Sequence, residues 1–205
     1  MKQTQLLITG ALILCCMTGC RMISKAEYKQ LQSPESPYIT GAAEFFDKEL
    51  TPYIESNAIP LNELISKIKS YTGFDEACSA LGYREGPDLQ CNFAVKVSGS
   101  ITEIKDGSRR GSITITDVGG KKVKIQIGPV IMGTSLRDVQ NKVGYKEFND
   151  QTVYGEFGKH LNSRSIEISS QNKFSVGDSY EVVGAISSWD VPTSVQITPV
   201  KYIKQ

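Results

Sequence analysis

The stretch Val123–Asp138, VKIQIGPVIMGTSLRD, decides the fold that the sequence predicts. Its first half alternates apolar and polar residues, which is the period of a strand buried on one face. The apolar positions are Val123, Ile125 and Ile127. Gly128-Pro129 then ends the regular ladder, because proline has no N–H to donate. Ser135 and Asp138 have the spacing of a capping box, which predicts a helix immediately after the strand. Apolar residues continue at helical spacing at Leu136, Val139 and Val143.

Four further segments show the same strand period, two before this stretch and two after it. Their apolar residues are Phe93, Val95, Val97 and Ile101; Ile113 and Ile115; Tyr180, Val182 and Ile186; Val195 and Ile197. Gly99 interrupts the first row, and a glycine inside a strand commonly marks a bulge or a sharp bend. Gly119-Gly120 predicts a hairpin between the second and third strands. The chain therefore predicts three meandering strands, a helical insert and two more strands.

This order is the pattern of an oligonucleotide/oligosaccharide-binding (OB) barrel. We expect a mainly β fold with α, in which residues 93–205 form a five-stranded OB-like β-barrel with a helix between strands 3 and 4. A second helix in the insert is expected around an apolar stripe, while residues 164–173 stay unassigned. The stripe consists of Val153, Tyr154, Phe157 and Leu161. An open antiparallel sheet with helices on one face is the alternative.

Residues 40–92 predict a small N-terminal helical subdomain. A first helix is expected after Gly41, bent or broken by Pro52, and a second begins at Pro60, a favourable first helical residue. A third, short helix is expected over Phe74–Leu81.

The first twenty residues predict an export address. Leu6–Cys16 is apolar but too short to span a bilayer, which is typical of a signal peptide over residues 1–19. Met17-Thr18-Gly19-Cys20 looks like the lipobox of bacterial lipoproteins, in which the cysteine receives lipid such as palmitate. We expect lipidated Cys20 to anchor the chain to a membrane and residues 20–39 to form a flexible tether. An ordinary secretory signal or an uncleaved anchor are the alternatives.

The placement predicted is the bacterial cell envelope, facing the periplasm. Arg21, rather than aspartate, after the lipidated cysteine favours the outer over the inner membrane. Of the five cysteines, Cys78 and Cys91 are the pair left outside the signal and anchor. In an oxidising compartment we expect them to form a disulfide, which closes a loop of about fourteen residues and adds roughly 3 kcal/mol. Two free buried thiols are the alternative.

Charge and composition exclude several function classes. Without Lys2 of the predicted signal, 22 basic residues (23 less one) face 22 acidic ones, so there is no basic excess to bind nucleic acid. The single histidine, His160, and the scattered carboxylates predict no metal site, and a catalytic role for His160 has little support. The glycines form no phosphate or dinucleotide fingerprint. We therefore expect no cofactor and no metal.

Six residues are candidates for contact with a ligand or partner: Arg109, Arg137, Asp138, Tyr154, Asn162 and Trp189. Arg137 and Asp138 fall in the first turn of the helix predicted at Ser135, where backbone N–H groups bind polar ligands. Alternatively, Asp138 caps that helix and Arg137 pairs locally with a carboxylate. Trp189 is either a platform on which a sugar stacks or a half-buried loop anchor.

The chain resembles the predicted periplasmic lipoproteins of domain-of-unknown-function family 2291. The resemblance rests on the central stretch, Gln126–Asp138, with four supporting segments. These are Ser108–Gly111, Phe148–Gln151, Leu161–Arg164 and Ile197–Val200. Members often accompany sugar ABC transporters, which implies a role near carbohydrate uptake, and the resemblance supplies no catalytic residues.

Together these observations predict a lipid-anchored, non-enzymatic binding or accessory module of the envelope, linked to sugar ABC transport. Its expected partners are the membrane, transporter components or carbohydrate. An enzyme acting on envelope carbohydrate is one alternative, and it needs two carboxylates converging in a cleft. A structural or assembly factor, marked by a large exposed apolar patch, is the other.

Overall fold

The structure is a computed structural model, and it describes residues 37–148 and 150–205. The predicted signal peptide, residues 1–19, and Cys20 lie outside the described residues. Within the described ranges, no helix combines the length and apolar character that crossing a bilayer requires.

Five strands close into a barrel. They are β2 (Cys91–Lys105), β3 (Arg110–Asp117), β4 (Lys122–Pro129), β5 (Ser179–Ser188) and β6 (Gln196–Lys204). The sheet runs β2-β3-β4-β6-β5, and β5 pairs again with β2, so the circuit has no free edge. All pairs are antiparallel except β4 with β6. The predicted closed barrel is therefore confirmed, and the open sheet is wrong.

Gly99 lies where β2 changes partner. From Cys91 to Ser100 this strand pairs with β5, and from Gly99 onward it pairs with β3, so Gly99 faces both Tyr180 and Asp117. A Cβ atom at this position would lie 2.2 Å from the carbonyl oxygen of Thr116, which excludes any side chain. The predicted bulge occurs just beyond it, between Ile101 and Glu103.

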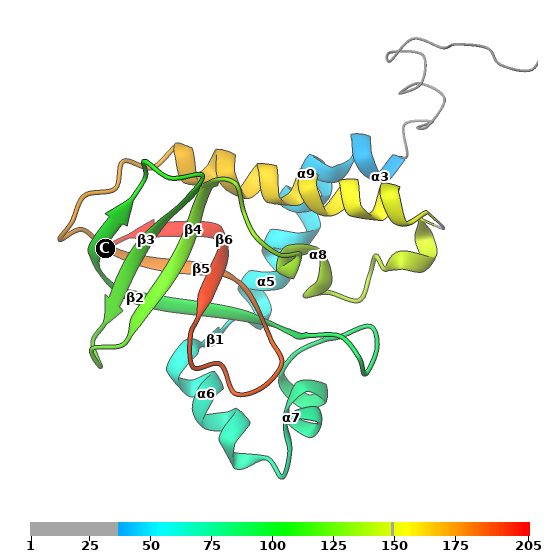
Figure 1. Ribbon diagram of the computed structural model, residues 1–205, viewed down its shortest axis with the longest axis horizontal. Helices are drawn as coiled ribbons and strands as arrows, with labels where there is room; N and C mark the ends of the chain where they lie inside the picture. The colour runs from blue at the N-terminus through cyan, green and yellow to red at the C-terminus, as the bar shows by residue number, and fades with distance from the viewer. Residues whose placement is uncertain (1–36, 149) are drawn as a thin grey trace, which may run out of the picture. The chain divides into compact units, whose positions relative to one another are not determined.

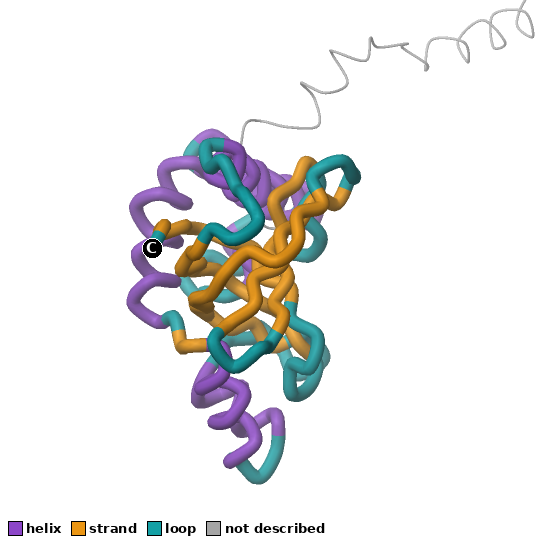
Figure 2. The backbone as a smooth tube through the Cα atoms, turned by 90° about the vertical axis from the view of Figure 1, so that its left-hand side faces the viewer, coloured by secondary structure: helices purple, strands orange, loops and turns teal. Residues whose placement is uncertain are grey.

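The helices cover the barrel on two sides (Figures 1 and 2). Below the strands in Figure 1, α6 (Leu61–Ser70) and α7 (Phe74–Leu81) add their apolar faces to the core formed by the inward side chains of the strands. The short β1 (Ile59–Pro60) pairs in parallel with β2. The helical residues therefore share the core of the barrel, and the division at residue 92 stays a prediction.

A second core lies outside the barrel. It joins the outward residues Ala94, Val183, Ala185 and Val200 to three helical segments. The N-terminal segment consists of α3 (Pro37–Thr40), α4 (Ala42–Phe45), the π-helix η2 (Phe46–Leu50) and α5 (Thr51–Asn57). The others are α8 (Ser135–Asp138) and α9 (Gln151–Ser170), which runs across the upper side of the strands in Figure 1.

Helix boundaries differ from the prediction at two places, Pro37 and Ser135. Helical structure begins at Pro37, inside the predicted tether, instead of after Gly41. The helix at Ser135 is a single turn, so Val143 is not helical. Its N-cap residue is Thr134 instead of Ser135, so the predicted capping box is wrong. Asp138 accepts from the Thr134 hydroxyl and from Arg137 instead of capping the helix.

Part of the unassigned segment, residues 164–173, is helical, because α9 continues to Ser170. Its buried hydroxyls are satisfied by β6: Ser165 donates to the Pro199 carbonyl, and the hydroxyls of Ser169 and Tyr202 are hydrogen-bonded at 2.9 Å. Small polar residues with such partners can be buried on a helix face, but they do not contribute to the apolar spacing from which a helix is predicted.

Gln126 fixes the path from β4 to α8. Its buried side-chain amide accepts from the Met132 N–H at 2.7 Å and donates to the Met132 carbonyl and to the Thr198 hydroxyl. Ser135 donates to the same Thr198 oxygen. The central stretch is therefore held to β6 by buried hydrogen bonds, and this places α8 at the end of the barrel.

Asp117 closes the hairpin between β3 and β4. Its Oδ1 accepts from the N–H groups of Gly119 and Lys121, and its Oδ2 accepts from the Asn62 amide of α6 at 2.6 Å. Burial acts to raise the pKa of Asp117, but these hydrogen bonds outweigh it and lower the pKa below its ordinary value of 3.8.

Replacing Gly99 by alanine is expected to lower the free energy of unfolding by roughly 3 kcal/mol, because the new methyl group overlaps the β3 backbone. Urea denaturation measures the change. Gly107→Ala is the matched control, since a Cβ atom there meets nothing within 4 Å. Equal stability of the two variants would contradict the account of β2.

The contribution of Asp117 to stability is expected to depend on pH. Because its pKa is lowered in the folded state, the ionised form stabilises the fold above its ordinary pKa, and this contribution disappears as the pH falls through the folded pKa. Wild type should therefore exceed Asp117→Asn in stability by a constant amount from pH 5 to 7. The difference should shrink below about pH 4. Urea denaturation across this range tests it, and a difference independent of pH would refute it.

Candidate functional site

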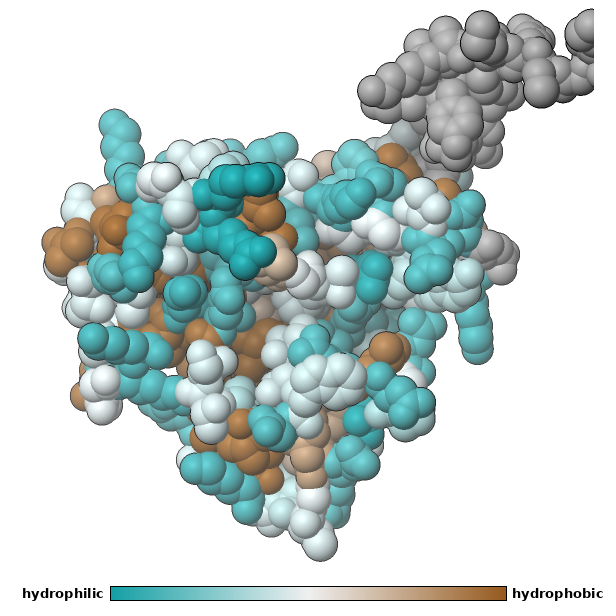
Figure 3. All heavy atoms as spheres, viewed as in Figure 1, coloured by the Kyte–Doolittle hydropathy of each residue, from teal (hydrophilic) through white to brown (hydrophobic). Residues whose placement is uncertain are grey.

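A half-open cavity of about 740 Å³ lies beside the end of the barrel where β2 begins and β5 ends. Its walls come from the segment between α7 and β2, from α8 and the segment after it, from the start of α9, and from the loop after β5. The lining residues are Tyr83, Glu85, Leu89, Gln90, Asn92, Thr134, Arg137, Asp138, Gln140, Val143, Gly144, Tyr145, Gln151, Tyr154, Gly155, Ser187 and Trp189. The space-filling view shows a recess to the right of its centre, in this region of the molecule (Figure 3).

Arg137, Asp138 and Tyr154 form one bonded group in the wall. The Arg137 guanidinium donates to both Asp138 oxygens, at 2.7 and 3.0 Å, and its carbon lies 3.8 Å from the centroid of the Tyr154 ring. The Tyr154 hydroxyl donates to Asp138 Oδ1 at 3.2 Å. Burial, then the Asp138 charge, raises the pKa of Tyr154, so the phenol stays protonated and keeps its hydrogen to donate.

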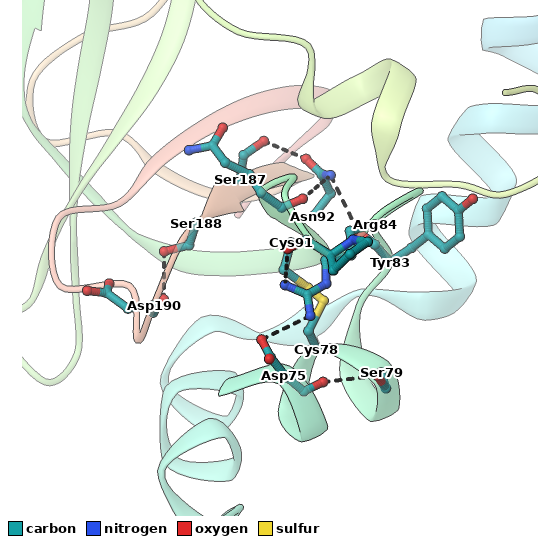
Figure 4. The surroundings of a disulfide bond; sticks show 12 residues. Asp75, Cys78, Ser79, Tyr83, Arg84, Cys91, Asn92, Ser187, Ser188 and Asp190 are labelled. Carbon is teal, nitrogen blue, oxygen red and sulfur yellow. Dashed lines mark hydrogen bonds and ion pairs between the residues drawn. A yellow bond between two sulfur atoms is a disulfide. The ribbon is translucent and has the colours of Figure 1, made fainter. Parts of the chain in front are cut away.

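The wall between α7 and β2 is fixed at both ends (Figure 4). The disulfide between Cys78 and Cys91, with Cα atoms 5.9 Å apart, ties it to α7, which confirms the predicted pairing. Asn92 and Tyr83 exchange two backbone hydrogen bonds, and the Ser187 hydroxyl of β5 donates to the Asn92 side chain. Figure 4 shows the Tyr83 ring turned away from the disulfide, and Tyr83 lines the cavity.

Exposed apolar side chains gather at the cavity. Three large apolar or aromatic side chains that line the cavity are well exposed: Leu89 (50%), Tyr145 (42%) and Trp189 (62%). Tyr145 also packs edge-on against Tyr154, with ring centroids 5.8 Å apart. A ligand entering the cavity would therefore meet aromatic surface that the fold leaves uncovered.

Four of the six predicted contact residues come together here: Arg137, Asp138, Tyr154 and Trp189 line the cavity. Arg109 lies in the loop between β2 and β3 and does not, and Asn162 uses its amide to hold the Gly133 carbonyl at 3.0 Å. The helix α8 is a single turn and Arg137 is paired with Asp138, so ligand contact by these two residues stays a prediction. The structure does show the local pairing of Arg137 with a carboxylate, which is the alternative interpretation.

Sequence reasoning missed the wall formed by Tyr83, Glu85, Leu89, Gln90 and Asn92. These residues have no motif of their own, and the signal that could have found them is Cys91, whose bridge folds the segment back on the barrel. His160 is exposed, Asp150 caps α9, and Glu156 pairs with Lys159. In the part of the chain that the structure describes, no cluster of three metal-ligating side chains occurs.

The family described as "Predicted periplasmic lipoprotein (DUF2291)" matches residues 11–202, nearly the whole chain. The chain belongs to this family. As a DUF2291 member it is a predicted periplasmic lipoprotein of the cell envelope, and lipoprotein character implies membrane association. No curated protein matches the sequence of this DUF2291 chain.

Among solved structures, the DUF2291 chain is similar to an OB-fold protein (TM0957) from Thermotoga maritima MSB8, with a TM-score of 0.64 and 14% identity over 83% of this chain and 99% of that one. This likeness shows the fold, an OB fold. Two binders, OBody AM3L15 and OBody AM1L10, each bound to hen egg-white lysozyme, also match. Their identities are 20% and 17%, over 58% of this chain and 80% and 85% of theirs, and both TM-scores are 0.30, too low to inform the fold.

Removing the disulfide by Cys78→Ser with Cys91→Ser is expected to lower the free energy of unfolding by about 3 kcal/mol, and to loosen one wall of the cavity selectively. Hydrogen exchange should speed up most over residues 82–90, while amides of the β3–β4 hairpin change only with global stability. Unchanged exchange over residues 82–90 would show that the disulfide does not hold this wall.

Proposed function

We propose that the protein is a non-enzymatic binding module that holds a small polyhydroxyl ligand, such as a sugar, in this cavity and serves carbohydrate uptake by an ABC transporter. The cavity is the observation that carries the proposal. Its volume suits a mono- or disaccharide, within the size range of small-molecule sites.

The lining combines the two kinds of group that sugars need. Aromatic rings from Tyr83, Tyr145 and Trp189 offer faces for the apolar side of a sugar ring. Planar amides and hydroxyls supply donors and acceptors for its hydroxyl groups. These polar lining residues are Gln90, Asn92, Gln151, Thr134 and Ser187.

The non-enzymatic role is supported by the positions of the carboxylates. An enzyme acting on envelope carbohydrate would need two carboxylates converging in a cleft, and Asp138, Asp150 and Glu156 are candidates for such a pair. Asp138 lines the cavity with its oxygens bonded to Arg137, Thr134 and Tyr154, whereas Asp150 and Glu156 do not line it. Glu85 also lines the cavity, but the Asp138 oxygens are already engaged by Arg137, Thr134 and Tyr154, and this favours holding a ligand over transferring a proton to it.

Placement supports the role in uptake. A lipid at Cys20 would keep the module at the membrane surface, and the outer membrane is our first choice because Arg21 follows the lipidated residue. The residues between Cys20 and α3 would give the module reach towards a transporter. The resemblance to lipoproteins that accompany sugar ABC transporters supports the same partner.

Trp189 is the only tryptophan, so its fluorescence reports on the cavity directly. Titrating the mature chain with a panel of mono- and disaccharides is expected to change the emission saturably for at least one of them. NMR of the ligand in the same samples should show the sugar chemically unaltered.

Trp189→Ala is expected to weaken binding of that sugar at least tenfold by calorimetry, about 1.4 kcal/mol, because the stacking face is lost. Val118→Ala, at a fully exposed position in the β3–β4 hairpin, is the matched control and should bind as wild type. A panel without any saturable change, or wild-type affinity in Trp189→Ala, would overturn the proposal.

A further inference from the structure

We infer that the cavity selects a polyhydroxyl ligand bearing a protonated amino group. The Glu85 carboxylate supplies the counter-charge of this group, and the aromatic side chains of the lining surround it. This inference rests on the proposed function, because it names the ligand class of the same cavity.

The charge balance of the lining is negative. Glu85, Arg137 and Asp138 are its charged residues, and Arg137 and Asp138 neutralise each other through two hydrogen bonds. Within residues 37–148 and 150–205, Glu85 makes no ion pair, and its side chain is accessible at the cavity wall. One uncompensated negative charge therefore faces the space where a ligand would lie.

A second carboxylate strengthens this charge. A Cβ atom built on Gly144 would lie 3.1 Å from Glu85 Oε1 and 3.5 Å from Glu147 Oε2, so the two carboxylates approach the same glycine. The Glu147 oxygen accepts from the Gly144 N–H but has no cationic partner in the described ranges. Because like charges raise each other's energy, a bound cation would relieve both.

The negative charge of these carboxylates also acts on Tyr83. Burial first, and then the charges of Glu85, Asp138 and Glu147, raise the pKa of its phenol. The largest charge effects on the pKa of Tyr83 therefore come from carboxylates.

The aromatic lining suits a cation as well as a sugar ring. Cations bind over the faces of tryptophan and tyrosine, and the protein already uses this contact where Arg137 lies over Tyr154. Tyr83, Tyr145 and Trp189 leave further aromatic surface at the cavity. An ammonium group beside Glu85 would therefore gain both a counter-charge and aromatic contact.

An acidic ligand finds the opposite conditions. Arg137 is the basic residue of the lining, and its guanidinium is engaged by Asp138 and reaches the Tyr154 carbonyl at 3.5 Å. A carboxylate or phosphate would have to break this ion pair and face Glu85, so we expect the cavity to reject it.

Calorimetric titration of the mature chain with D-glucosamine, D-glucose and D-glucuronate at about pH 6, where the amine is protonated, tests the inference. D-glucosamine is expected to bind at least tenfold more tightly than D-glucose, and D-glucuronate more weakly than either. The preference should decrease as salt is added, because it is electrostatic.

Glu85→Gln is expected to remove the preference, bringing D-glucosamine to the affinity of D-glucose. Asp88→Asn is the matched control, because Asp88 is an exposed acid of the same segment that does not line the cavity, and this variant should keep the preference. Equal binding of the amino and neutral sugars by wild type, or a preference that survives Glu85→Gln, overturns this inference and leaves the proposed function standing. Failure of every sugar to bind overturns the proposed function itself, and this inference with it.

Discussion

The shared pairing of β2 is the constraint on which the rest of the structure depends. One strand bonds β5 along its first ten residues and β3 along its last seven, and Gly99 and Ser100 belong to both ladders. Two sheets that meet at such a corner have no free edge, so all five strands enclose one core. Only glycine fits the corner, because the β3 backbone occupies the space of a side chain.

The cavity is built on this frame from segments that have little structure of their own. The first residues of β2 carry Cys91 and Asn92, which bind the wall before them to α7 and to β5. Gln126 of β4 and Thr198 of β6 are hydrogen-bonded to each other and fix the position of α8. The helix α9 packs Tyr154 against Arg137. A rigid barrel thus positions loops whose side chains remain available, which is the usual division of labour between scaffold and binding site.

The sequence predicted the barrel well because strand alternation, glycine position and strand order all indicate the same topology. It failed where side-chain hydrogen bonds or distant partners decide the structure. The predicted helix from Ser135 stops after one turn, where the Gln140 side chain bonds the Arg137 carbonyl and the N–H groups of Lys142 and Val143 in place of helical hydrogen bonds. The end of α9 was not predicted because its buried residues Ser165 and Ser169 are polar, and only their hydrogen bonds to β6 make their burial favourable. Glu85 and its neighbours join the cavity only through tertiary contacts, which no local pattern encodes.

The cavity beside the start of β2 is where we expect a ligand to bind. Amide chemical-shift mapping of the mature chain with a saturating sugar tests it most directly. We expect the largest shifts to cluster over residues 83–92, 134–145, 151–155 and 187–189, which contribute the cavity walls. Shifts concentrated instead on the β3–β4 hairpin or on α6 would contradict the account, because those elements lie outside the cavity.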